Sequence, residues 1–410
     1  MNSMWSDRKY VNIIINVLLF LTGINFLHYG QLILPVICLI LFIDNKFRIK
    51  VNDLKVFILL CLFAISFFAF SYQMGFYSVM GFCLPMAYYI GSNIRNDDQK
   101  NIKKLIYIIA FGMACHMVCN FLLEMLFWHD RLYYLFGKVT HYDIWLFDVI
   151  PPAERSQDGG LFSSIVFTRV KTTGTSLNYI MLASISYYLF KYETDKKTKY
   201  IGIILFILST IYCLALGRRT SFIVLAISLL LSFFLDNTGK GNHINKKTIK
   251  VLLILSLFVA IIVILAVFNV FGLQDLLMKF AIFNKIINQG FKTNRLEILF
   301  KSIAVAPKYL FGGRKMSTEV GDFVHDLWGD IYDYAGIIPY ILMLVYSLKL
   351  LKDMIALYRK HSVKKEYRIL YSVWFVCCAV IMFIEPVMTG ASLFLICVIL
   401  IATAITKENQ

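Results

Sequence analysis

Two short hydrophilic segments next to long apolar stretches carry paired basic residues. Arg218 and Arg219 occupy the turn ALGRRTSF, and Arg169 and Lys171 lie in FTRVKTTG. A guanidinium group binds phosphate oxygens through parallel hydrogen bonds, so such pairs suit a phosphate or diphosphate ligand. Anchoring to lipid headgroups at the membrane surface is the alternative role for these side chains.

A histidine opens a segment, HDLWGDIYDYAG, that mixes carboxylates with aromatic rings. His325 is followed directly by Asp326, and Trp328 lies two residues further on. Histidine exchanges a proton near neutral pH and can therefore act as a general base. Aromatic and carboxylate side chains suit the faces and hydroxyls of sugars. A purely structural role is the alternative for a single histidine.

Three more polar residues border or interrupt apolar stretches: Asn178, Arg295 and Glu385. A carboxylate inside a membrane is costly, so Glu385 is a functional candidate, although the proline that follows it also fits the end of a helix. Arg295, with Glu297 near it, fits a solvated helix face when taken alone. Its significance therefore depends on the other basic residues.

The composition indicates a membrane protein. The chain has 410 residues, of which 59% are hydrophobic and 16% are charged. Soluble domains carry about 25% charged residues, so lipid must take the place of water around much of this chain. The net charge of +16 fits basic cytoplasmic loops, which set membrane orientation. The expected partner is therefore a lipid bilayer and not a nucleic acid.

The apolar stretches predict an all-α polytopic membrane protein with about twelve transmembrane helices, since a bilayer core about 30 Å thick needs roughly 17–25 apolar residues per helix. The expected spans are 11–27, 31–43, 54–70, 74–90, 105–127, 176–190, 201–216, 221–235, 251–271, 336–351, 369–385 and 389–405. The second span is short, so it extends into its loops or re-enters the membrane. Residues 1–410 are expected to form a single integral membrane domain.

Lysine and arginine are concentrated in alternate loops. They are frequent in DNKFRIKVNDLK, NIRNDDQKNIKK, KYETDKKTKY, DNTGKGNHINKK and KDMIALYRKHSVKKEYR, and absent from HYGQ, SYQMG and the turn at 386–390. The positive-inside rule then places both termini in the cytoplasm. The N-terminal segment MNSMWSDRKY runs into an apolar stretch without a small-residue cleavage site, which predicts an uncleaved first span.

Two long connections lie on the external side, over 129–175 and 273–335. The first mixes aromatic, proline, glycine and charged residues, and the second contains amphipathic stretches such as LQDLLMKFAIFNKIINQGF. Loops longer than about 15 residues are usually functional or disordered, and these are too apolar for disorder. They predict a folded, partly helical cap over the external membrane face.

Cysteine and histidine patterns predict no disulfide framework, metal site or cofactor. All nine cysteines lie in apolar stretches, and none shows the spacing of zinc ligands. His129 and His141 likewise have no neighbours at metal-ligand spacing. The cysteines are therefore expected to pack as small apolar side chains.

In their order along the chain, the polar elements resemble motifs of the bacterial O-antigen polymerase and O-antigen ligase superfamily, a group of polytopic glycosyltransferases. Arg169 followed by Gly174 and Asn178 resembles an Arg–Gly–Asn entry to a central span. The ALGRRTSF turn resembles the Ser–Arg turn. Arg295 followed by PKYLFGG resembles the basic residue and Phe-Gly-Gly stretch of the large loop. The resemblance extends from Arg169 to the tenth expected span.

The histidine segment carries the most specific resemblance. The ligase pattern is His, then Asn, Ser or Gln, then nine residues, Gly, two residues, and Gly, Thr or Tyr. His325, Asp326, nine residues, Gly336, two residues and Pro339 reproduce this spacing. Asp326 and Pro339 depart from the pattern, which weighs against a ligase.

The resemblance implies a metal-independent, inverting glycosyltransferase that polymerises O-antigen or another surface polysaccharide at the periplasmic face of the bacterial inner membrane. The implied donor is an undecaprenyl-diphosphate-linked glycan, and a membrane-bound chain-length regulator is a further expected partner. The implied catalytic residues are His325, Arg218 and Arg295. The implied substrate-binding residues are Arg169, Lys171, Asn178, Arg219, Asp326 and Trp328.

Two other activities are alternatives. A ligase that transfers finished polymer to lipid A-core shares the same residues. A lipid-linked oligosaccharide flippase belongs to a different class, since transporters often contain repeated halves and discontinuous helices near the middle of the membrane. No repeat relates the two halves of this chain, and its polar groups gather at one external face, so the sequence favours the polymerase.

Overall fold

The computed structural model describes residues 3–25, 30–44, 51–71, 76–93, 99–127, 142–145, 166–169, 172–215, 295–321, 324, 326–359, 365–385, 387–390 and 392–408, together with scattered positions between 223 and 274. These residues are almost entirely helical, as expected. The strands among them are β1 (Tyr142–Trp145) and β2 (Val166–Arg169), which pair antiparallel. The described residues of the first long connection therefore comprise these two paired strands and the start of the helix at Thr172.

The N-terminal half forms α1 (Ser3–Gly23), η2 (Gly30–Ile33), α2 (Leu34–Asp44), α3 (Val51–Phe70), α4 (Phe76–Met80), α5 (Cys83–Asn93), α6 (Gln99–Phe127), α8 (Thr172–Tyr192) and α9 (Lys196–Ala215). The C-terminal half forms η4 (Val270–Gly272), α14 (Arg295–Val305), η5 (Ala306–Lys308), α15 (Lys315–Val320), α16 (Leu327–Ala335), α17 (Ile337–Arg359), α18 (Lys365–Ile384), α19 (Val387–Gly390) and α20 (Ser392–Glu408).

The helices coincide with the expected spans wherever the two can be compared. The expected span 251–271 lies mostly outside the described residues. The described positions of 221–235 are all helical, and every other expected span overlaps a helix. The span expected over 74–90 is divided into α4 and α5 by a turn, in which the N–H of Gly81 donates to the carbonyl of Ser78 at 3.3 Å. The short second span consists of η2 and α2.

Among the described helices, two are long and apolar enough to cross a bilayer, within Asp53–Phe70 of α3 and Ile102–Cys119 of α6. Shorter apolar helical stretches occupy Tyr10–Gly23, Gly30–Asp44, Ser372–Ile384 and Leu393–Thr406. α17 is long but contains Lys349, Lys352 and Asp353. These findings support a membrane protein, and the number of twelve spans stays a prediction.

α3 has apolar side chains on two opposite faces. Leu60 and Phe67 are fully buried, whereas Ile58, Leu62 and Ile65 are 47%, 51% and 55% exposed. One face therefore packs in the protein, and the other presents branched aliphatic side chains outward. Acyl chains are a favourable environment for such a face, whereas contact with water is not.

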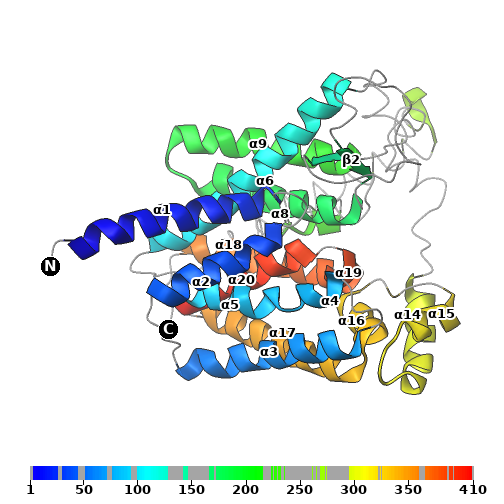
Figure 1. Ribbon diagram of the computed structural model, residues 1–410. Coiled ribbons are helices and arrows are strands. Elements are labelled where there is room, and N and C mark those ends of the chain that lie inside the picture. The colour runs from blue at the N-terminus through cyan, green and yellow to red at the C-terminus, as the bar shows by residue number, and fades with distance from the viewer. Residues whose placement is uncertain are drawn as a thin grey trace.

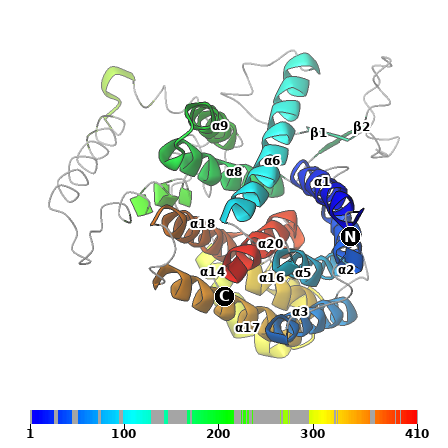
Figure 2. The same cartoon turned by 90° about the vertical axis from the view of Figure 1, so that its left-hand side faces the viewer.

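α20 lies at the centre of the bundle. Its residues 393–406 are all buried, and it contacts α5, α6, α8, α17 and α18 (Figure 2). A helix that is apolar on all sides belongs in an interior. Gly91 of α5 allows the closest approach, because a Cβ at this position would lie 2.5 Å from the carbonyl oxygen of Leu400 in α20. Small residues permit such contacts between membrane helices.

The two long connections meet the helices at the same end of the bundle. In Figure 1 the β1–β2 hairpin, α14, α15 and α16 lie toward the right, whereas α1 begins and the C-terminus lies toward the left. The hairpin pairs Tyr142 with Arg169 and Trp145 with Val166. Segments expected on the external side are therefore separated from the two termini by the length of the helices.

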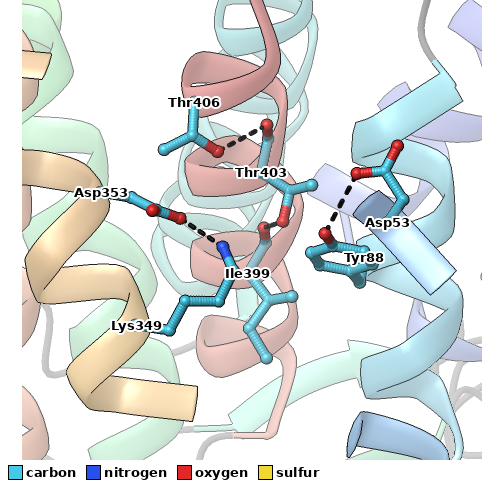
Figure 3. A network of polar contacts seen from close by, with 7 residues as sticks. All are labelled: Asp53, Tyr88, Lys349, Asp353, Ile399, Thr403 and Thr406. Atoms are coloured by element: carbon cyan, nitrogen blue, oxygen red, sulfur yellow. Dashed lines mark hydrogen bonds and ion pairs between the residues drawn. The ribbon is translucent and has the colours of Figure 1, made fainter. Parts of the chain in front are cut away.

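Polar contacts between and within helices lie near the end of the bundle that carries the termini (Figure 3). Tyr88 of α5 donates a hydrogen bond of 3.4 Å to the carboxylate of Asp53, in the first turn of α3. Lys349 pairs with Asp353 one turn further along α17, and Thr403 of α20 donates to the backbone of its own helix. These polar groups have partners, so their burial between apolar helices carries a smaller cost.

Candidate functional site

The predicted site residues differ in how far the structure describes them. Outside the described residues lie Lys171, Arg218, Arg219 and His325. Arg169 ends β2 and Arg295 begins α14, and both are described at the level of the backbone. Asn178, Asp326 and Trp328 are described with their side chains. The elements β2, α14 and α16 lie at the end of the bundle opposite the termini (Figure 1), and α8, which carries Asn178, begins there directly after β2.

Asp326 caps the N-terminus of α16. Its backbone is extended (φ −143°, ψ 163°), and its Oδ1 accepts a hydrogen bond of 2.7 Å from the N–H of Gly329. Burial raises the pKa of the Asp326 carboxyl, and the backbone N–H groups of Gly329 and Trp328 act in the opposite direction. The carboxylate thus has a structural role at a position predicted to bind substrate, and its binding role stays a prediction.

Replacing Asp326 with asparagine should preserve the cap, whereas alanine should lose about 1 kcal/mol of unfolding free energy. Because the pKa of Asp326 is raised in the folded state, its contribution to stability is complete below the unfolded-state pKa and declines as pH rises through the folded-state pKa. Unfolding measured from about pH 4 to 8 should therefore increasingly favour Asp326→Asn over the wild type. A difference independent of pH would contradict this account.

Trp328 is the second residue of α16, and its side chain contacts α18. Its indole packs on Phe383, with ring centroids 4.3 Å apart and planes inclined by 52°. The indole Nε1 is buried and has no hydrogen-bond partner among the described residues. An indole N–H is a donor only, and a buried donor without an acceptor costs about 1–3 kcal/mol. An oxygen atom of a ligand would satisfy it.

Asn178 lies in the second turn of α8. Its side chain is 7% exposed, and its Oδ1 has no hydrogen-bond partner among the residues that the structure describes. An amide oxygen accepts up to two hydrogen bonds, so this atom can accept from a ligand hydroxyl. Asn178 and Trp328, which were both predicted to bind substrate, thus each retain an unsatisfied buried polar atom.

α8 and α16 each contact both α18 and α19. Glu385 lies between α18 and α19 and is 4% exposed, and its N–H donates to the carbonyl of Ile381 at 2.9 Å. This bond closes the last turn of α18, as the adjacent proline in the sequence indicates. A buried carboxylate therefore lies between α18 and α19, the two elements that α8 and α16 both contact.

The Phe-Gly-Gly stretch and the end of α16 are joined by backbone contacts. The N–H of Ile337 donates to the carbonyl of Leu310 at 2.8 Å. Gly312 has φ 71° and Gly336 has φ 88°, and a Cβ on Gly312 would lie 2.6 Å from the nitrogen of Gly336. Two stretches that resemble separate motifs in the sequence therefore form one structural unit, with glycine on both sides of the contact.

One buried histidine, His116, was not selected from the sequence as a candidate site residue. His116 of α6 is 5% exposed, and its Nδ1 lies 2.8 Å from the hydroxyl of Tyr179 in α8, the residue after Asn178. The ring of Tyr179 packs edge-on against Tyr212 of α9, with centroids 5.0 Å apart. An ionisable residue within an expected span was the available signal. Its pairing with α8 required the three-dimensional structure.

Comparison of the sequence with protein families and with curated protein sequences finds no match. No protein-family model matches the sequence, and no curated protein sequence matches it significantly. The resemblance to polysaccharide polymerases and ligases is therefore carried by the order and spacing of the residues alone, and the activity that it implies is a proposal.

Proposed function

We propose that the protein is a surface-polysaccharide polymerase that joins undecaprenyl-diphosphate-linked oligosaccharide units at the periplasmic face of a bacterial inner membrane. The termini lie in the cytoplasm in this arrangement, and the bundle end with β2, α14 and α16 faces the periplasm. A membrane-bound chain-length regulator is the expected protein partner.

The observation that supports the proposal is that Asn178 Oδ1 and Trp328 Nε1 are buried and have no hydrogen-bond partner among the described residues, on two helices that both contact α18 and α19. One atom accepts and the other donates a hydrogen bond. A glycan presents many hydroxyls and ring oxygens, which meet both needs. The indole also offers an apolar face of the kind on which sugar rings pack.

Transfer breaks the bond between the anomeric carbon of the donor glycan and a diphosphate oxygen, and forms a bond from that carbon to an acceptor hydroxyl oxygen. Arg218, Arg219 and Arg295 stabilise the charge that develops on the departing diphosphate, and Arg169 assists in holding it. His325 accepts the proton of the attacking hydroxyl. Attack opposite the leaving diphosphate inverts the anomeric centre.

The experiment that tests the function is the surface-glycan banding pattern of a deletion strain with and without the wild-type gene. A polymerase predicts a single core-plus-one-unit band in the deletion and a restored ladder on complementation. Loss of all attached glycan, with lipid-linked polymer accumulating at the periplasmic face, would instead identify a ligase. Single lipid-linked units retained at the cytoplasmic face would identify a flippase and contradict both enzymes.

A further inference from the structure

Arg314 adopts a backbone conformation that suits glycine or asparagine better than arginine. Its φ is 55° and its ψ is 20°, directly after two glycines that also have positive φ. The other non-glycine residues with positive φ in the described part of the chain are Asn25 and Asn269. Asparagine enters this region readily, whereas a long side chain does so at a conformational cost. Strain of this kind is typical of positions where the side chain has a function.

The surrounding structure holds this strained residue in place. The N–H of Arg314 donates to the carbonyl of Asp333 at 2.8 Å. Its own carbonyl accepts hydrogen bonds from the hydroxyls of Ser317 at 3.1 Å and Thr318 at 2.8 Å. Hydrogen bonds therefore hold both the backbone N–H and the backbone carbonyl of Arg314. They also fix the direction in which the Cα–Cβ bond leaves the backbone.

The guanidinium lies on an aromatic platform. Its Cζ is 5.2 Å from the ring centroid of Tyr334, a side chain that is 5% exposed. Tyr334 in turn stacks on Phe67 of α3, with centroids 5.3 Å apart and planes inclined by 19°. Stacking on an aromatic face leaves the edge N–H donors of a guanidinium available for hydrogen bonds. The charge is thus held over the ring of Tyr334 at the α16 end of the bundle.

Glu319 and Asp333, two carboxylates of the segments next to Arg314, accept hydrogen bonds from other residues. Glu319 accepts from Lys308 at 2.8 Å and from Tyr309 at 2.6 Å, and Lys308 and Tyr309 lower the pKa of Glu319. Asp333 uses its Oδ1 to accept the N–H of Ser317 at 3.0 Å. No ion pair joins the guanidinium of Arg314 to a carboxylate among the described residues, so its positive charge is available to an anionic ligand.

We propose that Arg314 is an anion-binding residue whose ligand is a phosphate or diphosphate group presented at this end of the bundle. The inference rests on the proposed function only for the source of that group, a lipid-linked diphosphate. Edge-on hydrogen bonds from a planar guanidinium match the geometry of phosphate oxygens. This ligand explains an arginine at a left-handed position that lies over a buried ring and has no ion pair among the described residues.

The test compares ligand binding by the purified full-length protein and its Arg314→Gly and Arg314→Asn variants. Both replacements accept a positive φ, so the melting temperature should equal or exceed that of the wild type. Affinity is measured for inorganic pyrophosphate, for a short-chain polyprenyl diphosphate and for phosphatidylglycerol in nanodiscs. Lys315→Ala is the matched control, because it removes an adjacent exposed cation without altering the strained residue.

Both Arg314 variants should bind a diphosphate probe about tenfold or more weakly, as expected for the loss of a charged hydrogen-bonding partner. Lys315→Ala should change affinity by less than about twofold. A loss confined to the prenyl diphosphate identifies the lipid-linked source, and an equal loss for pyrophosphate identifies the free group. A loss confined to phosphatidylglycerol identifies a lipid headgroup. Unchanged affinity for all three probes in both stable variants overturns the proposal.

The outcome is separable from that of the proposed function. If binding depends on Arg314 but the deletion strain keeps its polysaccharide ladder, the anion site stands and the polymerase assignment fails. If the ladder is lost on deletion and restored by Arg314→Gly, with affinities equal to the wild type, the polymerase stands and the anion site fails.

Discussion

Replacing Arg218 or Arg295 with alanine is expected to abolish polymer growth while leaving the amount of protein in the membrane unchanged. The diphosphate gains negative charge as the glycosidic bond breaks, and a cation aimed at that charge stabilises the transition state more than the ground state. Removal of one such group typically lowers the rate by about 10² to 10³. Arg295 occupies the first position of α14, at the bundle end that also carries α16.

The measurement is the polysaccharide ladder of a deletion strain complemented with each variant, together with an immunoblot of the membrane fraction. Lys301→Ala is the matched control on the same helix, because Lys301 is exposed and pairs with Glu297 at 2.7 Å. That pair is worth little, so the control should restore a full ladder. A ladder of normal length with either arginine variant would remove that arginine from the proposed mechanism.

Gly336→Ala is expected to destabilise the junction between the Phe-Gly-Gly stretch and α16 by more than about 3 kcal/mol. Gly336 has φ 88° and ψ −167°, a region that is essentially restricted to glycine. A Cβ there would also lie 2.3 Å from the carbonyl oxygen of Leu310 and 2.7 Å from the Cα of Phe311. Both neighbours are backbone atoms, so they cannot move aside as a flexible side chain would.

Gly321→Ala separates the two contributions. Gly321 also has a positive φ, of 83°, but a Cβ at this position would meet no atom within 4 Å. Alanine there should therefore lose only about 1 kcal/mol through its conformation. Unfolding in mixed detergent micelles measures both variants, and equal losses would show that the contact at Gly336 is not tight.

Helix positions were largely predictable from hydropathy. The spans expected over 54–70 and 105–127 lie within α3 and α6, since a run of apolar residues long enough to cross a bilayer is also long enough to form a stable helix there. The division at Gly81 was not predicted. A hydropathy average treats the turn between Met80 and Cys83 as part of one apolar stretch, although the helical hydrogen bonding is interrupted.

The candidate site was predictable only in part. Residue type and order indicated Asn178 and Trp328, and the structure adds that each holds a buried polar atom with no hydrogen-bond partner in the described part of the chain. The capping role of Asp326 had a signal in the sequence, since aspartate is a favoured N-cap, but the substrate-binding interpretation took precedence. Arg314 had no signal in the sequence. Its significance arises from its left-handed backbone conformation and from the ring of Tyr334, which lies twenty positions further along the chain.

The central position of α20 bears on how the protein is made. In the expected membrane topology, helices enter the bilayer in the order of their synthesis, so α5, α6, α8, α17 and α18 would be inserted before α20, the helix around which they pack. Until α20 arrives, the surfaces that will enclose it face lipid or one another. Insertion and assembly are consequently separate stages, and the mature core can close only after the last of these segments has left the ribosome.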